Sequence, residues 1–182
     1  MARAEAIVGP IDLPINNAGL EPSGAYTAFT DAELLEVAEI NLLAPMLLTR
    51  HALPGMLARR RGHIVMISSL AGRAGNAFNV PYATTKAGLV SCAQSLRAEL
   101  EGTPVSASVV CPGFIANDGM YADIQREFGV NAPVALRAVD PERVADAVMQ
   151  AVTDDRPDIL ITGWRCGRCS RSTSSPRGSP SV

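Results

Sequence analysis

Lysine, aromatic residues and long apolar runs are scarce in this chain, and each scarcity narrows what the chain can be. Of its sixteen basic residues one is a lysine, Lys86, and fifteen are arginines, while aromatic residues make up only 4%. Because no run of roughly 18 apolar residues occurs, we expect no membrane-spanning helix. The first residues, MARAEAIVGP, lack the long apolar segment of a secretory signal. We therefore expect a cytoplasmic protein.

Cysteine is also sparse, and its four residues form no recognisable framework. Cys92 and Cys111 lie singly in apolar segments and are expected to be small buried side chains. Cys166 and Cys169 have the spacing of half a zinc site, but no second pair and no histidine follow them. We therefore expect neither a disulfide framework nor a metal site.

Composition divides the chain into a globular part and a tail. The 182 residues are 47% apolar and 19% charged, which suffices for a buried core. The net charge of −2 is uneven, since residues 163–182 hold four arginines and no acid, which leaves −6 for residues 1–162. We expect residues 1–162 to form one domain. Residues 163–182 are expected to be disordered, either as a functional tail or as the product of a reading-frame error.

Short apolar runs alternate with longer stretches that carry helical signals. Four runs predict strands, at residues 13–18, 62–69, 105–111 and 158–162, and three stretches predict helices, at residues 30–61, 82–101 and 140–153. Thr30 and Glu33 form a capping box, and irregularities are expected around Pro45 and Pro54. The alternation predicts an α/β fold in which parallel strands are joined by right-handed crossovers.

The single lysine lies four residues after a tyrosine, in the segment YATTK at residues 82–86. On a helix this spacing places Tyr82 and Lys86 on one face. An adjacent cation favours the phenolate, so we expect the pKa of Tyr82 to fall from about 10 toward neutrality. Such a tyrosine can give or take a proton at neutral pH. The spacing alone is common in proteins, and further motifs are needed to support this interpretation.

Polar or glycine-containing motifs follow three of the predicted strands. Asn16-Asn17-Ala18-Gly19 follows the first, Ser69 ends the second, and Pro112-Gly113 follows the third. Because the carboxyl ends of parallel strands meet at one edge of a sheet, these motifs are expected to lie together. Open α/β sheets bind their ligands at this edge. A further polar residue, Asn41, lies within the first long helical stretch.

This combination resembles the short-chain dehydrogenase/reductase (SDR) family. The resemblance covers roughly residues 5–163 and is carried by five motifs: NNAG at 16–19, Asn41, SS at 68–69, YATTK at 82–86 and PG at 112–113. It implies a partial Rossmann-like, doubly wound parallel sheet made of the family's last four strands. It also implies an NAD(P)-dependent oxidoreductase that interconverts an alcohol and a ketone on a small-molecule substrate, with the choice of NAD or NADP left open.

The resemblance assigns roles to individual residues. It implies that Tyr82 is the catalytic acid/base, that Lys86 is its electrostatic partner, and that Ser69, rather than Ser68, holds the substrate oxygen. Asn41 matches the helix asparagine that holds a water of the proton relay. The cofactor-binding residues implied are Asn16, Ala18, Gly19, Tyr82, Lys86, Pro112, Gly113 and Asn117. Asn117 stands where the family often has a threonine that bonds the nicotinamide amide.

Simpler roles remain open for several of these residues. Ser69 alone would be interpreted as a strand-end cap, and Asn41 as a polar residue that bends a helix near Pro45. Asn16 and Asn17 are equally suited to a turn. The two histidines, His51 and His63, are isolated in the sequence and are expected to be structural.

The chain departs from the family in one main respect. The sequence contains no TGxxxGxG turn, the segment that gives backbone N–H groups and a helix N-terminus to the cofactor's pyrophosphate. We interpret the chain as N-terminally truncated relative to the family, with the edge of the strand at 13–18 left bare. Pro14, which lacks a ladder donor, is a further oddity in that strand.

Partners follow from the same comparison. Residues 114–139 match the family's variable substrate segment, and their apolar side chains indicate an apolar substrate. Family dimers pair the helix that begins near Asp31 and the helix that carries Tyr82, so a homo-oligomer is expected. The alternative to an enzyme is a non-catalytic remnant that acts by association with itself or with a partner. Binding of nucleic acid by the tail is disfavoured because it would rest on four arginines.

The absent glycine-rich turn predicts that this chain binds NAD(P)H weakly or not at all, because the pyrophosphate has no cradle of backbone N–H groups. Titrating the chain with NADH and with NADPH, followed by nucleotide fluorescence, should show no saturation in the micromolar range. A dehydrogenase that contains TGxxxGxG serves as the positive control. Saturable micromolar binding to this chain would contradict the prediction.

Overall fold

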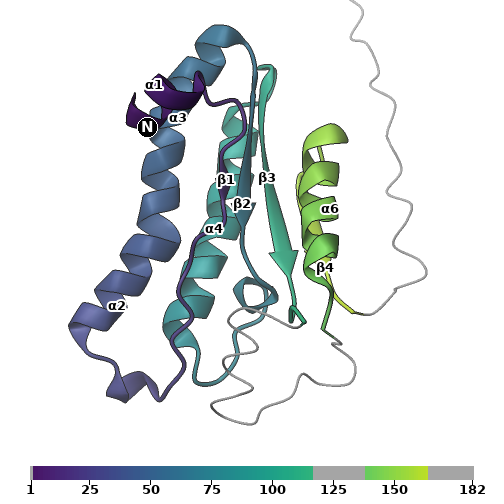
Figure 1. Cartoon of the computed structure of the whole chain (residues 1–182). Helices are drawn as coiled ribbons and strands as arrows, with labels where there is room; N and C mark the ends of the chain where they lie inside the picture. Colours follow the sequence, from purple (N-terminus) through teal and green to yellow (C-terminus); the bar gives the residue numbers. More distant parts are fainter. Residues whose placement is uncertain (1, 117–137, 164–182) are drawn as a thin grey trace, which may run out of the picture.

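The structure, a computed structural model, describes residues 2–116 and 138–163 and contains one parallel sheet. Its strands are β1 (Ile15–Asn16), β2 (Gly62–Ile67), β3 (Val105–Pro112) and β4 (Asp158–Ile161), in the spatial order β1-β2-β3-β4 (Figure 1). Every neighbouring pair is parallel. The four predicted strands and the α/β fold are therefore confirmed. The predicted tail from residue 164 and the cofactor candidate Asn117 lie outside the described residues.

Helices connect and cover these strands. They are α1 (Ala2–Val8), α2 (Asp31–Ala38), α3 (Ala44–Arg59), α4 (Val80–Glu99) and α6 (Pro141–Thr153), with a π-helical segment η2 (Glu39–Leu43) and 3-10 turns η1 (Tyr26–Ala28) and η3 (Leu70–Gly72). None of the described helices is long and apolar enough to cross a membrane.

The predicted first long helix is divided into three segments. Its start is confirmed, because the Thr30 hydroxyl accepts a hydrogen bond from the Glu33 N–H and the Glu33 carboxylate accepts one from the Thr30 N–H. The irregularity lies at η2, directly before Pro45, while Pro54 is accommodated inside α3. A π-helical turn adds a residue to one turn of the helix and is often found at functional sites. Here it contains Asn41.

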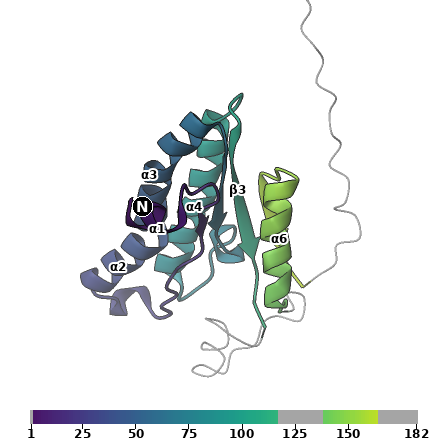
Figure 2. The same cartoon turned by 45° about the horizontal axis from the view of Figure 1, so that its top comes forward.

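Two apolar clusters, one on each face of the sheet, form the core. Alternate β2 residues divide between them, since Ile64 and Met66 pack toward α3 and α4 while Val65 and Ile67 pack toward α6. This alternation follows from the period of two along a strand. Figures 1 and 2 show α6 on the opposite side of the sheet from α3 and α4, so that the molecule has three layers.

The placement of α6 corrects the expectation that every crossover is right-handed. All four strands are parallel and follow one another in sequence across the sheet, yet α4 covers one face and α6 the other. The connection from β3 through α6 to β4 therefore has the opposite hand to the connection from β2 through α4 to β3. A crossover between parallel strands of one sheet is right-handed in nearly all proteins, so the connection from β3 to β4 is an exception to that rule.

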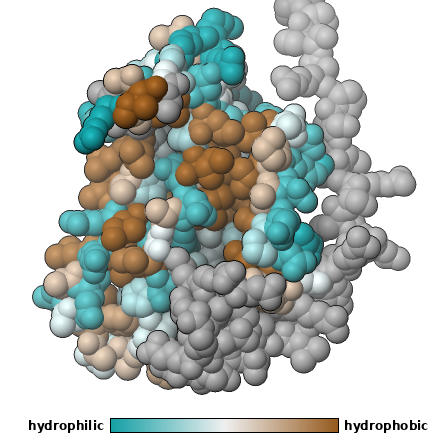
Figure 3. Space-filling model, viewed as in Figure 1, coloured by the Kyte–Doolittle hydropathy of each residue, from teal (hydrophilic) through white to brown (hydrophobic). Residues whose placement is uncertain are grey.

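The first strand is short and lies at the edge of the described sheet. The carbonyls of Asp12 and Pro14 accept hydrogen bonds from the N–H groups of His63 and Val65, at 2.9 and 3.0 Å. Pro14 therefore joins the ladder as an acceptor and lacks only its donor. Leu13 and Ile15 are exposed, and Figure 3 shows apolar groups among polar ones on this face.

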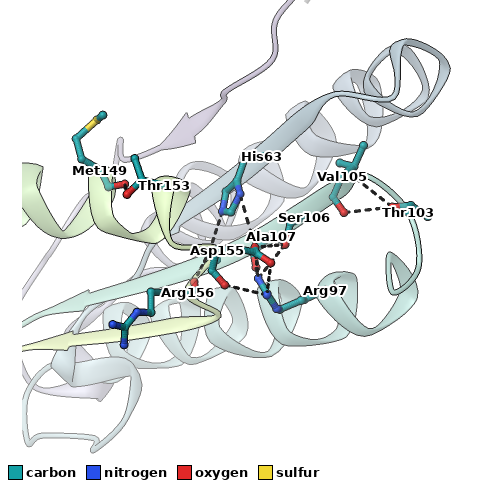
Figure 4. Close-up of polar contacts among 11 residues, drawn as sticks. His63, Arg97, Thr103, Val105, Ser106, Ala107, Met149, Thr153, Asp155 and Arg156 are labelled. Atoms are coloured by element: carbon teal, nitrogen blue, oxygen red, sulfur yellow. Dashed lines mark hydrogen bonds and ion pairs between the residues drawn. The ribbon is translucent and has the colours of Figure 1, made fainter. Parts of the chain in front are cut away.

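A polar cluster closes the amino edge of the sheet, opposite the edge that carries the predicted active site (Figure 4). His63 Nε2 lies 2.8 Å from Ser108 Oγ, and the Ser108 hydroxyl donates to the carbonyl of Arg156. Since that hydroxyl has a single proton, the histidine nitrogen is the donor of the pair. Asp155 accepts two hydrogen bonds from the Arg97 guanidinium, and its Oδ1 lies 3.9 Å from His63 Nδ1.

The same cluster contains a serine, a histidine and an aspartate in contact, but it lacks the features of a hydrolase. An open cavity of about 1050 Å³ is lined by His63, Arg97 and Asp155, among others. Ser108 does not line this cavity and is fully buried, with its proton engaged by a backbone carbonyl. A nucleophile needs an accessible oxygen and a base that accepts its proton. The cluster therefore joins β2, β3 and the turn before β4 as a structural unit.

We predict that acid weakens the fold through His63. Burial, the largest cause, and the nearby Arg97 charge lower the pKa of His63, while Asp155 opposes them. Below about pH 6.5 His63 therefore binds a proton more readily in the unfolded chain than in the folded one. As the pH falls through this range, the free energy of unfolding decreases by at most about 1.4 kcal/mol per pH unit. Urea unfolding at pH 7.5 and 5.5 should show a smaller loss for His63→Gln, whose amide keeps a donor toward Ser108. His51→Gln should retain the wild-type loss, and equal losses in all three proteins would contradict the prediction.

A second prediction concerns Gly72, at the end of η3. A Cβ on Gly72 would lie 2.7 Å from the backbone carbonyl carbon of Lys86 and 2.7 Å from Ser68 Oγ. Because the backbone of α4 cannot move without displacing the helix, Gly72→Ala should destabilise the fold by about 1–3 kcal/mol in urea unfolding. Gly75→Ala is the matched control, since nothing lies within 4 Å of its added Cβ. Equal stability of the two variants would show that η3 does not pack tightly on α4.

Candidate active site

Tyr82 and Lys86 lie one turn apart near the amino end of α4 and are both buried, with 7% and 3% of their surface exposed. The Lys86 ammonium lies 5.5 Å from the centre of the Tyr82 ring and donates a hydrogen bond of 3.0 Å to the carbonyl of Ile67. Ile67 is the last residue of β2. The helical spacing of YATTK thus brings both side chains to the carboxyl end of this strand.

The two serines after β2 have different surroundings. Ser68 is buried, and its hydroxyl donates a hydrogen bond of 2.7 Å to the carbonyl of Lys86, which joins the strand end to α4. Ser69 is partly exposed and lies near enough to the Tyr82 phenol to lower its pKa, and its oxygen accepts a hydrogen bond from the Ala71 N–H. The structure therefore places Ser69 beside the phenol and gives Ser68 a packing role.

Asn41 is fully buried in η2 and uses its amide to hold two other segments. Its Oδ1 accepts from the Leu20 N–H at 2.7 Å, and its Nδ2 donates to the Leu20 carbonyl at 2.8 Å and to Thr85 Oγ1 at 3.2 Å. Thr85 lies between Tyr82 and Lys86 on α4. Asn41 therefore fixes the loop after β1 against α4, and its role in a water relay stays a prediction.

The remaining predicted residues lie at the same edge. Asn16 is buried and its amide donates to Met66 Sδ at 3.3 Å, whereas Asn17 and Ala18 are exposed. Pro112 is buried at the end of β3, and the Gly113 N–H donates to the carbonyl of Ile161 at 2.8 Å. The segments NNAG and PG therefore lie at the carboxyl ends of β1 and β3, on either side of β2.

Sequence reasoning missed an acidic residue at this site. Glu21, two residues after Gly19, accepts a hydrogen bond of 2.8 Å from Asn79 Nδ2, and Asn79 is the N-cap of α4. The carboxylate of Glu21 interacts electrostatically with both Tyr82 and Lys86. The only signal in the sequence was the closeness of Glu21 to the NNAG motif.

The protonation of the pair differs from the sequence-based expectation. Burial, and to a lesser extent the Glu21 charge, raise the pKa of Tyr82 to about 12. The neighbouring Ser69 has a smaller, opposing effect. Burial lowers the pKa of Lys86 to about 8, against the attraction of Glu21. The expected fall in the pKa of Tyr82 is therefore wrong for this structure. The reason is that burial of the phenol and the negative charge of Glu21 both disfavour the phenolate.

The described residues fit one end of a nicotinamide cofactor. An ammonium has three donors, and one of those of Lys86 is used by Ile67. A Cβ on Gly19 would lie 3.3 Å from Lys86 Nζ, so glycine keeps the space beside the ammonium open. For the pyrophosphate, residues 2–116 and 138–163 offer no glycine-rich turn that leads a strand into a helix away from the catalytic edge.

Comparison with curated proteins gives consistent relatives. Residues 1–127 match the family described as short chain dehydrogenase. The chain is 43% identical over 159 residues to the ketoacyl reductase HetN of Nostoc sp., which covers 87% of this chain and 54% of that protein. It is 36% identical over 146 residues to the 3-oxoacyl-[acyl-carrier-protein] reductase FabG of Aquifex aeolicus, which covers 79% and 58%. The chain thus spans somewhat more than half of the length of these curated relatives.

A solved structure is similar over most of the chain. The crystal structure of a short-chain dehydrogenase from Streptomyces avermitilis has a TM-score of 0.74 and 26% identity, and it covers 89% of this chain and 64% of that one. The family match, the identities above 30% and the fold agree with the juxtaposition of Tyr82, Lys86 and Ser69. The chain therefore belongs to the short-chain dehydrogenase family.

Proposed function

We propose that this chain forms the catalytic edge of an NAD(P)-dependent oxidoreductase that interconverts a ketone and an alcohol. The observation that supports the proposal is the position of the Tyr82 phenol near Ser69 and one turn from Lys86, at the carboxyl end of β2. Perturbed titratable groups at this edge of an open α/β sheet are typical of a catalytic site.

Each residue has a task in carbonyl reduction. The bound cofactor supplies the hydride, and the protein supplies orientation and proton transfer. The Ser69 hydroxyl donates to the substrate oxygen and holds it beside the Tyr82 hydroxyl, which gives that oxygen its proton. Lys86 provides the charge that stabilises the phenolate left behind, and its free donors are suited to the hydroxyls of the nicotinamide ribose. Asn41 keeps the loop at Leu20 in place, and we assign it the relay water.

The substrate is proposed to be an apolar carbonyl compound. The two relatives described above are named for reduction of ketoacyl or 3-oxoacyl groups, in which a carbonyl is joined to an acyl chain. In this chain the Val139 N–H donates to the Phe114 carbonyl, and Ile115 pairs with Val139. These contacts hold residues 114–116 and Val139 together after the carboxyl end of β3, and the sequence between them includes the apolar residues Met120, Ile124 and Phe128.

The second candidate function is assembly without catalysis. A groove of about 380 Å³ between α3 and α4 is lined mainly by apolar side chains, including Met46, Leu53, Leu57 and Leu96. Exposed apolar residues continue along α3, at Leu47 and Leu48. This surface favours self-association of the chain as a homo-oligomer whether or not the chain turns over a substrate.

We predict that Tyr82→Phe abolishes carbonyl reduction by the polypeptide that contains this chain, with a loss of kcat of about 100-fold or more, because the proton donor is removed while the ring is kept. Tyr26→Phe, at an exposed position, is the control and should leave kcat unchanged. Initial rates with a ketone and NADPH or NADH measure both.

The same variant separates the two candidate functions. If Tyr82→Phe leaves turnover intact, the proposed catalytic role of this tyrosine is excluded. If neither protein turns over any ketone but both sediment as the same oligomer, assembly is the better description. Sedimentation velocity of the wild type and of Tyr82→Phe provides that comparison.

A further inference from the structure

Glu21 lies on a loop that is held at three successive points against the catalytic helix and its neighbour. Leu20 exchanges two hydrogen bonds with the Asn41 amide, at 2.7 and 2.8 Å. Glu21 Oε1 accepts from Asn79 Nδ2 at 2.8 Å, and the Gly24 N–H donates to the carbonyl of Phe78 at 2.8 Å. The position of the Glu21 carboxylate is therefore determined by backbone and side-chain contacts on both sides of it.

Asn79 is committed to this carboxylate. The residue is 4% exposed, and as the N-cap of α4 it makes no capping hydrogen bond with its side chain. Its Oδ1 is buried and has no hydrogen-bond partner among the described residues. A buried amide with one unmet oxygen costs free energy, so the bond to Glu21 is the interaction that retains it in this orientation.

The carboxylate acts on both members of the catalytic pair. Its negative charge raises the pKa of both Lys86 and Tyr82. Burial raises the pKa of Glu21 itself, and the Lys86 charge opposes that rise. The ammonium also lies 3.3 Å from the position of a Cβ on Gly19, in the same loop. The Ile67 carbonyl and the Cys111 thiol of β3 also interact with the Lys86 ammonium.

We propose that Glu21 is a positioning residue of the catalytic pair, whose carboxylate, held at the amino end of α4 by Asn79, supplies negative charge near Lys86 and Tyr82. Such a charge favours the ammonium form of Lys86 and disfavours the phenolate form of Tyr82. Glu21 therefore sets the charge state of the pair before a substrate binds. The catalytic meaning of this inference rests on the proposed function, while the coupling of Glu21 to Lys86 does not.

The other charged groups nearby are occupied elsewhere and are unchanged by the test. Arg73 of the turn after η3 pairs with Asp158 and donates to Cys111 Sγ, and burial raises the pKa of the Cys111 thiol. Ser69 bonds to Tyr82 and carries no charge. Glu21→Gln removes the negative charge but leaves an amide oxygen that can accept from Asn79, so a purely structural role would survive the substitution.

The chain offers an unusually clean probe, because Lys86 is its only lysine. Protein labelled with lysine carrying ¹³C at Cε gives one lysine signal in NMR, and its change with pH reports the pKa of Lys86 without an assignment step. The wild-type midpoint is expected near pH 8. In Glu21→Gln the midpoint should move to lower pH, because the ammonium loses its counter-ion.

Two further variants control the measurement. Glu36→Gln, at an exposed position on α2, changes the net charge equally and should leave the Lys86 midpoint where it is in the wild type. Glu21→Asp keeps the charge and should move the midpoint less than Glu21→Gln does. Equal midpoints in the wild type and Glu21→Gln would overturn the proposal, and so would equal shifts in Glu21→Gln and Glu36→Gln.

The effect on the phenol is measured in the same way. Tyrosine labelled with ¹³C at Cζ gives a Tyr82 signal that is identified by its loss in Tyr82→Phe. In Glu21→Gln this signal should begin to titrate at lower pH than in the wild type, and an unchanged titration would overturn the effect of Glu21 on Tyr82. Neither measurement requires turnover, so a failure of the proposed enzyme activity is seen separately, as turnover that survives Tyr82→Phe.

Discussion

The buried Lys86 is the residue around which the carboxyl edge of the sheet packs. Its Nζ donates to the carbonyl of Ile67 at the end of β2, and its own carbonyl accepts a hydrogen bond from Ser68. The backbone at Lys86 leaves no room for a Cβ on Gly72, and a Cβ on Gly19 would make tight contacts with the ammonium and with Asn41. One residue of α4 therefore sets the distance of the helix from the strand, from η3 and from the loop after β1.

The chemistry of lysine explains why this position differs from the other basic positions. A charge is costly to bury unless it is paired and hydrogen-bonded. An ammonium is compact and can lose its proton when it is buried, whereas a guanidinium is larger and stays charged. The carbonyl of Ile67 and the negative charge of Glu21 offset part of the cost, and the lowered pKa of Lys86 reflects the remainder. In a chain whose other basic residues are arginines, this buried position holds a compact group whose charge can change.

Local signals predicted much of the fold, and nonlocal ones account for the errors. The strand periods, the capping box at Thr30 and the helical spacing of Tyr82 and Lys86 depend on neighbours in sequence, and the structure follows them. The π-helical turn at Asn41 could not be predicted, because it is associated with hydrogen bonds to Leu20 and Thr85, distant in sequence. The face covered by α6 is an exception to the usual handedness rule, and no local pattern in the sequence indicates such an exception. The predicted pKa of Tyr82 was wrong because the helical spacing predicts only that Lys86 is a neighbour. It indicates neither that the phenol is buried nor that Glu21, in the loop after β1, adds a negative charge.

The two edges of the sheet show that residue types alone do not define a site. The amino edge places Ser108, His63 and Asp155 in contact, a set of residues that in other arrangements performs hydrolysis. There the Ser108 hydroxyl is fully buried and donates to a backbone carbonyl, and the Asp155 carboxylate accepts from Arg97. The cluster therefore holds strands together. At the carboxyl edge the Ser69 hydroxyl is partly exposed and its partner is the phenol of Tyr82. At the carboxyl edge, loops follow the parallel strands, and the loop that holds Glu21 contacts α4 through Asn79. Access to solvent and the destination of the hydroxyl proton, rather than the identity of the side chains, therefore distinguish the proposed catalytic edge of this sheet from its structural one.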